Sequence, residues 1–483
     1  MTSSTLPNLL VALSIPQDFS RFDKLTDEQT LAQLIQWKND VYASLASLCD
    51  LLAMRHGITS LPVNEQADIA ACVSAFDGPG EWIADSAPSL ARSILDPLTA
   101  PHIPPVVLTQ ILTHHLRPAF AANPHPRLNL QTGRKLHEPA DTQDAYAGQV
   151  WKTRVGTANV LAWCLRNVDA NTYESVWHLI IPPVMTLLDD FEASYKLQGV
   201  RLVSDLLSCV PPELLKRTGV DGLLFTSLSG TFNHLRDPLT PNLIRAAIPT
   251  TLQLIDLTTP PSLAPLPLTS AYPSSDRTIM KSSSSRADPA TRYERLSTLL
   301  GSCLIGTVFL YAYADPEAIL AATDMLPPVL THLGIGATRW LKALIPQLTH
   351  ALLSPATYPT PSRDINLRLE VSSLRALCTC IETCAPRMHL WKCNIIDAVG
   401  RAWVSAMDIE LEGQVSQIVY SGAGDQVLEY KALLQNTCIK LAKAWPRVIQ
   451  SLHMQEEYQQ LLSFDSAHFN GLVGDICSAT SDI

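Results

Sequence analysis

Apolar residues recur at helical spacing through most of this 483-residue chain, and most clearly between residues 176 and 210. The second half of that stretch places five apolar residues on one helical face: Leu197, Val200, Val203, Leu207 and Val210. This is the spacing of a helix buried on one side. An equally apolar segment comes before it, and the polar residues 189–194 separate the two. The pattern predicts a helix pair, which cannot bury both faces alone and needs copies on either side.

Four residues define the turn of this predicted pair. Asp189 and Asp190 follow the first helix, and a carboxylate there can accept hydrogen bonds from the exposed amides that open the next helix. Lys196 lies early in the second helix, and Gly199 lets the neighbouring helix approach closely. We interpret the four residues as a structural turn and a possible interface.

The same periodicity predicts helices along the rest of the chain, with few strand signals. Thr26 and Gln29 form a capping box before the first long helix. Asn171, with Glu174 three residues later, predicts another helix start. The expected helices lie near residues 26–56, 64–76, 86–95, 103–120, 149–168, 171–188, 195–210, 211–219, 221–235, 241–257, 296–314, 316–332, 337–353, 364–384, 388–408, 426–445 and 447–464.

A repeated Pro-Pro pattern supports a repeat architecture. It occurs at residues 103–106, 181–184 and 326–329, and apolar helix follows each copy. The first two copies are separated by two units of about 39 residues, near the roughly 40–47 residues of HEAT and armadillo repeats. We therefore predict an all-α fold, an α-solenoid of HEAT/armadillo-like helical repeats.

Composition divides the predicted solenoid into segments. Residues 1–140 form an N-terminal helical region of divergent repeats, and its first 25 residues look weakly ordered. Central repeats occupy 141–258. A linker at 259–289, rich in Ser and Pro, cannot bury a core and should be disordered. Further repeats occupy 290–464, and 465–483 are a tail.

Charge and hydropathy limit the kinds of partner. The net charge of −10, without a basic run, argues against nucleic acid. The eleven Cys are scattered through apolar segments, as expected for reduced residues of an intracellular protein. The short apolar run at the N-terminus has no basic residues before it, which argues against a signal peptide. Residues 296–314 are uncharged, and we favour a buried helix there over a membrane span.

The sequence contains few signals of catalytic chemistry. The chain has no phosphate-binding loop, zinc-protease motif or nucleophile elbow. Asp189 and Asp190 could be paired carboxylates for acid/base catalysis, but their place in an inter-helix turn favours capping and solvation. We expect no catalytic activity, cofactor or metal.

Other groups of polar residues also have ordinary explanations. Cys378 and Cys380 lie two apart on a predicted helix, so they point to different faces, whereas structural zinc sites present cysteine pairs on turns. We therefore favour buried packing over a metal site for the cluster of Cys378, Cys380, Cys384, Cys393 and His389. His114 and His115 are expected at the surface or as caps. We interpret Lys196, Lys216 and Arg217 as a solvated or turn-facing ridge rather than an anion site.

Three stretches carry a family resemblance. Residues 187–199, followed by 214–219, read LLDDFEASYKLQG and LLKRTG; residues 334–348 read GIGATRWLKALIPQL; and residues 384–387 read CAPR, leading to AVGRAW at 398–403. In this order they resemble the Tel-two-interacting protein two family, over roughly residues 150–445. The insertion at 259–289 suits fungal members.

The resemblance implies a non-catalytic α-solenoid subunit of the TTT complex. Its partners would be the Tel-two protein and Tel-two-interacting protein one. The complex would act as a co-chaperone of the ninety-kilodalton heat-shock chaperone for phosphatidylinositol-3-kinase-related kinases, in DNA-damage and TOR signalling. The expected location is cytoplasmic and nuclear, without nucleic-acid or membrane binding.

The motif-rich stretches after residue 334 suggest the partner-binding region. We expect residues 334–445 to hold Tel-two-interacting protein one, with Arg339, Trp340, Lys342 and Trp403 as candidate contacts. Two alternatives remain open. One is a different HEAT or armadillo adaptor, such as a transport or phosphatase scaffold, and the other is an enzyme or metal protein.

Overall fold

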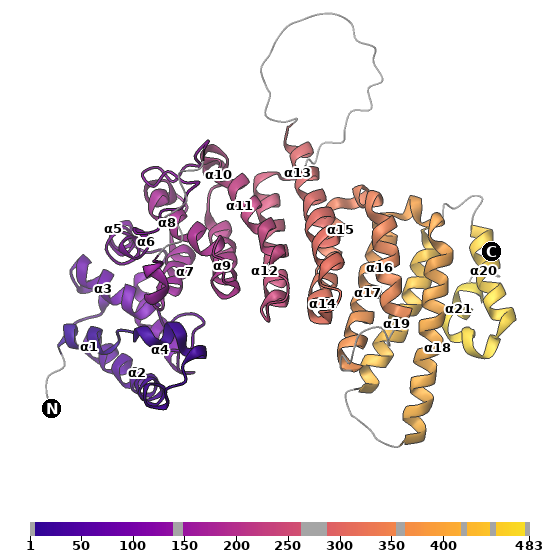
Figure 1. The fold of residues 1–483 in the computed structure, drawn as a ribbon, viewed down its shortest axis with the longest axis horizontal. Coiled ribbons are helices and arrows are strands. Elements are labelled where there is room, and N and C mark those ends of the chain that lie inside the picture. Colours follow the sequence, from indigo (N-terminus) through magenta and orange to yellow (C-terminus); the bar gives the residue numbers. More distant parts are fainter. Residues whose placement is uncertain are drawn as a thin grey trace, which may run out of the picture. The chain divides into compact units, whose positions relative to one another are not determined.

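The computed structural model describes residues 5–138, 148–261, 287–353, 363–416, 423–444 and 451–478 (Figure 1). These residues fold into helices packed on one another, with no strand among them and an isolated bridge between Leu128 and Lys135. The predicted all-α helical-repeat solenoid is therefore confirmed. The chain divides into two compact units, unit 1 at Met1–Leu228 and unit 2 at Ser229–Ile483.

Unit 1 contains a helix of 27 residues among shorter ones in its first half, and a pair of helices of 16 and 17 residues near its end. Its elements, with η4 a π-helix and the other η elements 3-10 helices, are α1 Leu6–Ala12, η1 Gln17–Lys24, α2 Glu28–Met54, η2 Ile58–Ser60, α3 Val63–Ser74, α4 Ala87–Leu95, η3 Asp96–Leu98, α5 Pro105–Gln110, η4 Ile111–Leu116, α6 Arg117–Phe120, η5 Val150–Thr153, α7 Thr157–Asn167, α8 Tyr173–Leu188, α9 Ala193–Cys209, α10 Pro212–Thr218 and α11 Val220–Gly230.

Packing in unit 1 joins neighbouring helix pairs. Helix α2 packs on α1 and α4, and α3 packs on α5 and α7. Helix α9 packs on both α7 and α8, so the predicted helix pair lies within the repeat stack. Every apolar residue predicted on the α9 face is buried, as the 3.6-residue period requires.

Unit 2 combines helices of 8 and 9 residues with helices of 19 to 25 residues. Its elements, with η7 a π-helix, are η6 Thr231–Asn233, α12 Thr240–Thr258, α13 Ala287–Ser297, η7 Thr298–Phe309, α14 Pro316–Asp324, α15 Leu326–Leu333, η8 Gly334–Trp340, α16 Leu341–Leu353, α17 Arg363–Thr383, η9 Ala385–Leu390, α18 Lys392–Ser416, α19 Ala423–Lys443, α20 Ser451–Phe464 and α21 Ser466–Ser478.

Two rows of helices form unit 2. One row runs from α12 through α14 and α17 to α19 and α21, each helix packing on the next. The other includes α13 against α15 and α16 against α18, and α16 also packs on α17 (Figure 1). The two rows therefore enclose one continuous apolar layer, as in helical-repeat proteins.

Both ends of the chain are more ordered than predicted. Helices α1 and η1 form within the first 25 residues and bury Leu6, Leu9, Leu13 and Phe19. The stretch predicted as a tail contains α21, which packs on α19 and α20. Apolar residues at irregular spacing supply the buried faces of these short helices, and a search for long periodic segments misses them.

Several helix boundaries differ from the predictions. The N-cap of α2 is Asp27, whose carboxylate accepts a hydrogen bond from the Thr30 amide at 3.0 Å, rather than Thr26. The N-cap of α8 is Thr172, one residue after the predicted Asn171. The predicted helix at 149–168 is divided, because Gly156 has a φ of +84° between η5 and α7.

The Pro-Pro pattern marks helix starts in two of its three copies. Pro104 caps α5 and Pro105 is its first residue, and the third copy opens α15. The central copy, Pro182-Pro183, instead lies inside α8. The Pro-Pro pattern therefore does not mark a repeat boundary at every copy.

The apolar segment at 296–314 forms the π-helix η7 and packs on α14. Among the described residues, Pro316–Leu353 is long and apolar enough to cross a membrane. This stretch is not the one that the sequence suggested, residues 296–314. Of its most apolar window, 56% is buried inside the protein. Gly334, with a φ of +54°, interrupts the stretch, which comprises four elements rather than one straight helix.

The predicted linker at 259–289 lies mostly outside the described residues, although its last residues already belong to α13. Residues 139–147, part of a predicted loop, also lie outside them. The division between the two units falls after residue 228, so the last two residues of α11 belong to unit 2. The predicted limits of the repeat segments stay predictions.

Candidate functional site

Asp189 lies at the end of α8 in a polar cluster. Its carboxylate is 2.9 Å from His125 Nε2 and also bonds the Ser227 hydroxyl. Burial alone would raise the pKa of Asp189, but the hydrogen bonds from His125 and Ser227 and the nearby charge of Lys196 lower it below its usual value. Asp189 is thus held as a carboxylate that joins the turn to α11 and to the loop after α6.

Asp190 is the most deeply buried charge of this turn. Its side chain is inaccessible to solvent and accepts hydrogen bonds from Lys152 Nζ at 3.0 Å, Gln149 Nε2 at 3.2 Å and the Glu192 amide at 2.8 Å. Lys152 also bonds Glu192. Because every partner is a donor, the buried charge is compensated.

Lys196 is buried, with 5% of its surface exposed, and its ammonium group donates to the Leu188 carbonyl at 2.7 Å. Burial lowers the pKa of Lys196, whereas Asp189 and Asp190 raise it by a smaller amount. Of the two predicted positions for Lys196, on a solvated ridge or facing the turn, the buried ammonium group excludes the first and agrees with the second. A cation at the carbonyl end of α8 satisfies a group that the helix itself leaves unpaired.

Asp190 is bonded to protein groups and not solvated, so the solvation expected for this carboxylate is wrong. The structural and interface roles of the turn stay predictions. The cavity beside Asp189 measures about 10 Å³, roughly the space of one water molecule. A substrate cannot enter a space of that size. Phe191, at the tip of the turn, is exposed, and a partner contact there stays a prediction.

The second candidate region lies at η8 and the start of α16. Arg339 and Lys342 are both exposed, and neither pairs with a carboxylate among the described residues. The Arg339 guanidinium lies 5.3 Å from the centre of the Trp340 ring. The Trp340 ring packs on Gly301 of η7 so closely that a Cβ there would lie 2.2 Å away. Trp340 thus fixes η8, from which Arg339 projects, against η7.

Two exposed apolar side chains lie at the same short helix, one on η8 itself and one reaching it from α13. Ile335 of η8 is 58% exposed, and Tyr293 of α13 is 42% exposed. Tyr293 reaches η8, since a Cβ on Gly336 would lie 2.8 Å from its ring. We call Tyr293, Ile335, Arg339 and Lys342 the η8 surface. Aromatic and Arg side chains of this kind anchor protein interfaces.

Trp403 does not belong to this surface. It is 4% exposed, and its indole nitrogen donates to the His468 carbonyl at 2.8 Å. Its ring also packs on Gly471. Trp403 therefore holds α18 to α21, and we do not include it among the candidate contacts.

Most of the cysteine cluster is packed inside unit 2. Cys378, Cys380 and Cys384 are buried, whereas Cys393 is exposed on α18. Cys378 Sγ lies 3.3 Å from the Thr437 hydroxyl, and a hydrogen bond from Cys380 lowers the pKa of Cys384 to about 7. In the described part of the chain, no three His, Cys, Asp or Glu side chains are grouped to hold a metal.

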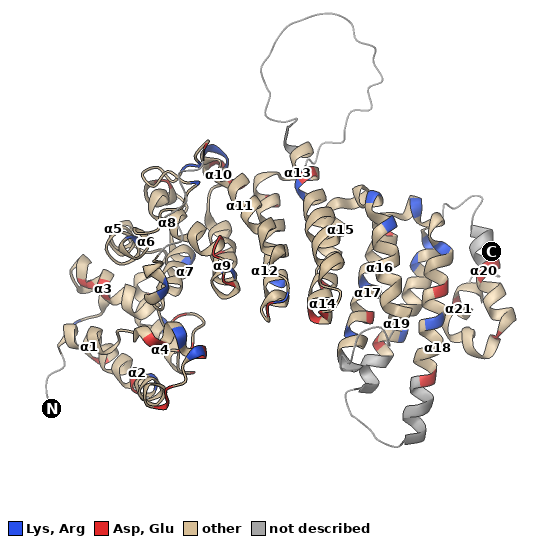
Figure 2. Ribbon diagram, in the orientation of Figure 1, with Lys and Arg blue, Asp and Glu red and all other residues tan. Residues whose placement is uncertain are grey.

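Other predicted surface residues lie as expected. His114 is exposed, and His115 Nε2 lies 3.0 Å from Asp68. Arg217 pairs with Glu174 at 2.6 Å. Acidic and basic residues alternate over residues 392–408 of α18 (Figure 2), so this part of the helix offers no single-sign strip of the kind that binds nucleic acid.

Two comparisons with known proteins follow from the sequence and the structure. A family model described as the Tti2 family matches residues 69–359, more than half of the chain. The crystal structure of an engineered protein aligns with 98% of this chain and 95% of its own, at 14% identity and a TM-score of 0.33. A likeness that weak carries no argument about function.

Proposed function

Because the chain belongs to the Tti2 family, a scaffold family whose members are subunits of the TTT complex, we propose that it is a non-catalytic co-chaperone scaffold. With the Tel-two protein and Tel-two-interacting protein one, it supports the folding, assembly and stability of phosphatidylinositol-3-kinase-related kinases together with the ninety-kilodalton heat-shock chaperone. It acts in the cytoplasm and the nucleus, in DNA-damage and TOR signalling. The family match carries this proposal, and it gives no support to a transport or phosphatase adaptor.

The structure adds a physical argument for a scaffold. The carboxylates of the turn after α8 are occupied by Lys152, His125 and backbone groups. They stabilise helix packing and have no room for a substrate. Helical repeats instead present long surfaces, on which exposed anchors bind other proteins.

Within this function, the η8 surface is the proposed contact for Tel-two-interacting protein one. Two cations without a carboxylate partner among the described residues come from η8 and the first turn of α16, and two exposed apolar side chains, Ile335 and Tyr293, lie on or against η8. The complementary partner surface would carry carboxylates around an apolar pocket. Deletion of residues 334–445 would remove helices that form the core of unit 2, so point substitutions are the sharper test.

The test is the double charge reversal Arg339→Glu with Lys342→Glu. We expect recovery of Tel-two-interacting protein one with the tagged chain to fall at least tenfold, because like charges then face each other. Arg21→Glu with Lys24→Glu is the matched control, since these exposed residues in unit 1 have the same identity and spacing. Unchanged recovery with the η8 variant would place the interface elsewhere.

A further inference from the structure

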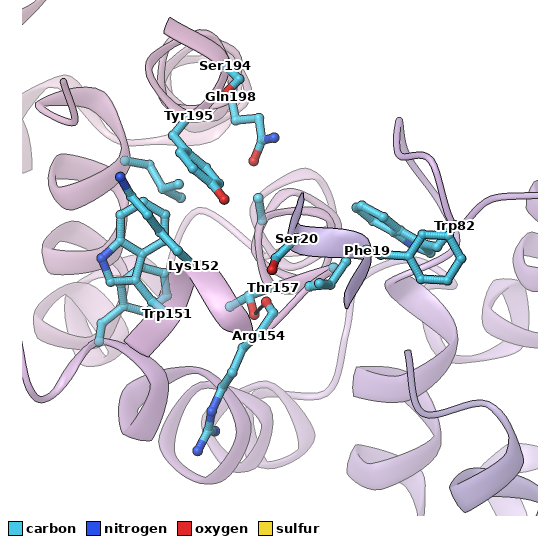
Figure 3. Close-up of a pocket in the computed structure, with 15 residues that line it drawn as sticks. Phe19, Ser20, Trp82, Trp151, Lys152, Arg154, Thr157, Ser194, Tyr195 and Gln198 are labelled. Carbon is cyan, nitrogen blue, oxygen red and sulfur yellow. Dashed lines mark hydrogen bonds between the residues drawn. The ribbon is translucent and has the colours of Figure 1, made fainter. Parts of the chain in front are cut away.

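Unit 1 contains a second cavity, of about 140 Å³, beside Tyr195 (Figure 3). We call it the Tyr195 cavity. Segments distant in the sequence form it: η1, the loop after α3, α6, η5 with the start of α7, and the α8–α9 pair. The exposed residues Arg154 and Ser194 are part of its lining, so the cavity reaches the surface.

Five aromatic side chains line the cavity: Phe19, Trp82, Phe120, Trp151 and Tyr195. Trp151 stacks on Phe120 at 5.7 Å between ring centres and meets the edge of Tyr195 at 5.0 Å. The Trp82 indole is fixed by its hydrogen bond to the Ala75 carbonyl at 3.0 Å. These contacts hold the walls in place before any ligand enters, so binding costs little ordering of the site.

Three uncharged polar groups point into the same space. Figure 3 shows the Tyr195 hydroxyl, the Gln198 amide and the Ser20 hydroxyl directed toward the cavity. No hydrogen bond joins these three side chains to other described residues. Burial, followed by the charges of Glu192 and Asp190, raises the pKa of Tyr195 to about 12, so its hydroxyl remains a donor at neutral pH. A ligand with a hydroxyl group could form hydrogen bonds with these three side chains.

The charges around the cavity exclude a cationic ligand. No Asp or Glu among the described residues lines it, whereas Lys152 and Arg154 do. Lys152 Nζ lies 4.8 Å from the Tyr195 ring centre and 5.4 Å from that of Trp151, so the cation position over these rings is taken. Figure 3 shows Arg154 extending away from the cavity. What remains suits a neutral aromatic ring.

We propose that the Tyr195 cavity binds a tyrosine side chain of a partner polypeptide. Its volume of about 140 Å³ is close to the roughly 150 Å³ of a buried cavity that accepts benzene. The ring would pack between the aromatic walls, and its hydroxyl would bond Tyr195, Gln198 or Ser20. This inference does not depend on the TTT assignment, since it concerns a site on the isolated chain.

The first experiment compares p-cresol with toluene, the side-chain analogues of tyrosine and phenylalanine. Calorimetry and ligand-observed NMR on the purified full chain should show one p-cresol site, with toluene at least about tenfold weaker. Toluene would leave the three polar groups without partners. N-acetyl-tyrosinamide should compete with p-cresol, because a polypeptide must reach the same site. Equal binding of toluene, tighter binding of phenyl phosphate, no p-cresol binding or no competition would overturn the proposal.

Variants locate the site. Gln198→Leu combined with Tyr195→Phe should weaken p-cresol about tenfold while toluene binding is kept. Ala158 is part of the lining, so the larger side chain of Ala158→Leu should prevent binding of both p-cresol and toluene. Ala162→Leu is the matched control one helical turn later in α7, outside the lining, and should leave binding unchanged. Thermal unfolding confirms that each variant is folded. Binding retained in Ala158→Leu would show that the ligand lies elsewhere.

Discussion

Gly199 of α9 lies so close to Leu188 of α8 that a Cβ at residue 199 would be 2.3 Å from the Leu188 amide nitrogen. Backbone cannot yield as a flexible side chain does, so the two helices can meet only where a side chain is missing. The same turn places Asp189, Asp190 and Lys196 against their partners. The close approach of the two helices therefore sets the geometry of the whole cluster.

Gly199→Ala should lower the free energy of unfolding by about 2 kcal/mol or more, since overpacking forces the backbone to shift. Gly222→Ala is the control, because it lies inside α11 and the position that its new methyl group would take has nothing within 4 Å. There, alanine should be neutral or stabilise by about 0.5–1 kcal/mol. Urea unfolding of both variants checks the difference. Equal stability of the two would contradict the packing described for α8 and α9.

Lys152→Met should destabilise the protein by about 3–5 kcal/mol, because it leaves the buried Asp190 carboxylate without its cation. Adding Asp190→Leu should restore much of the loss, since both charges are then absent. Arg217→Met is the comparison. Its partner Glu174 is 72% exposed, and such pairs contribute about 0.2–1 kcal/mol. Thermal and urea unfolding measure these three variants and Asp190→Leu alone, and additive effects of the two buried substitutions would argue against the ion pair.

Glu370 predicts a pH dependence in unit 2. Burial raises its pKa to about 7, while a hydrogen bond with Tyr430 lowers it by a smaller amount. The ordinary pKa is 4.5, so the folded state binds the proton more tightly than the unfolded state. Its contribution to stability is fully present below pH 4.5 and is lost as the pH rises through about 7.

Glu370→Gln should therefore match the parent near pH 4.5 and exceed its stability at pH 8 by about 1–3 kcal/mol. Urea unfolding across this range gives the difference curve. Glu382→Gln is a suitable control on the same helix, because Glu382 is exposed. A difference curve that stays flat for Glu370→Gln would show that the carboxyl is charged in the folded protein.

Cys393 should be the cysteine that iodoacetamide modifies fastest in the folded chain, since it is the exposed thiol among the described residues. Cys384 should react only after unfolding, although its pKa is lowered to about 7, because its sulfur is buried. Mass spectrometry of peptides after timed alkylation separates the two. Rapid labelling of Cys384 in the native protein would mean that η9 opens away from α17.

The parts of the fold that depend on local pattern could be predicted from sequence. The α8–α9 pair follows from apolar spacing, and α10 follows from the proline at its start and Gly219 at its end. Gly199 could be recognised for the same reason, because a glycine inside an apolar helical face indicates close packing.

The partners of the turn could not be predicted. Lys152 lies 38 positions from Asp190, and His125 lies 64 positions from Asp189. Such pairs form only when the repeats stack, and single-sequence periodicity carries no information on which segments stack. Trp403 was misjudged for the same reason, since its partner helix α21 was not predicted. The Tyr195 cavity combines residues from five segments, and no local motif marks it.

The central claim is that this chain is a scaffold subunit of the TTT complex. Affinity purification of the tagged chain from its own cells, with mass spectrometry of the bound proteins, tests it most directly. We predict recovery of two large helical-repeat partners, the Tel-two protein and Tel-two-interacting protein one, with phosphatidylinositol-3-kinase-related kinases in smaller amounts. Stable recovery of a transport factor or a phosphatase in their place would contradict the account, although the helical-repeat fold would stand.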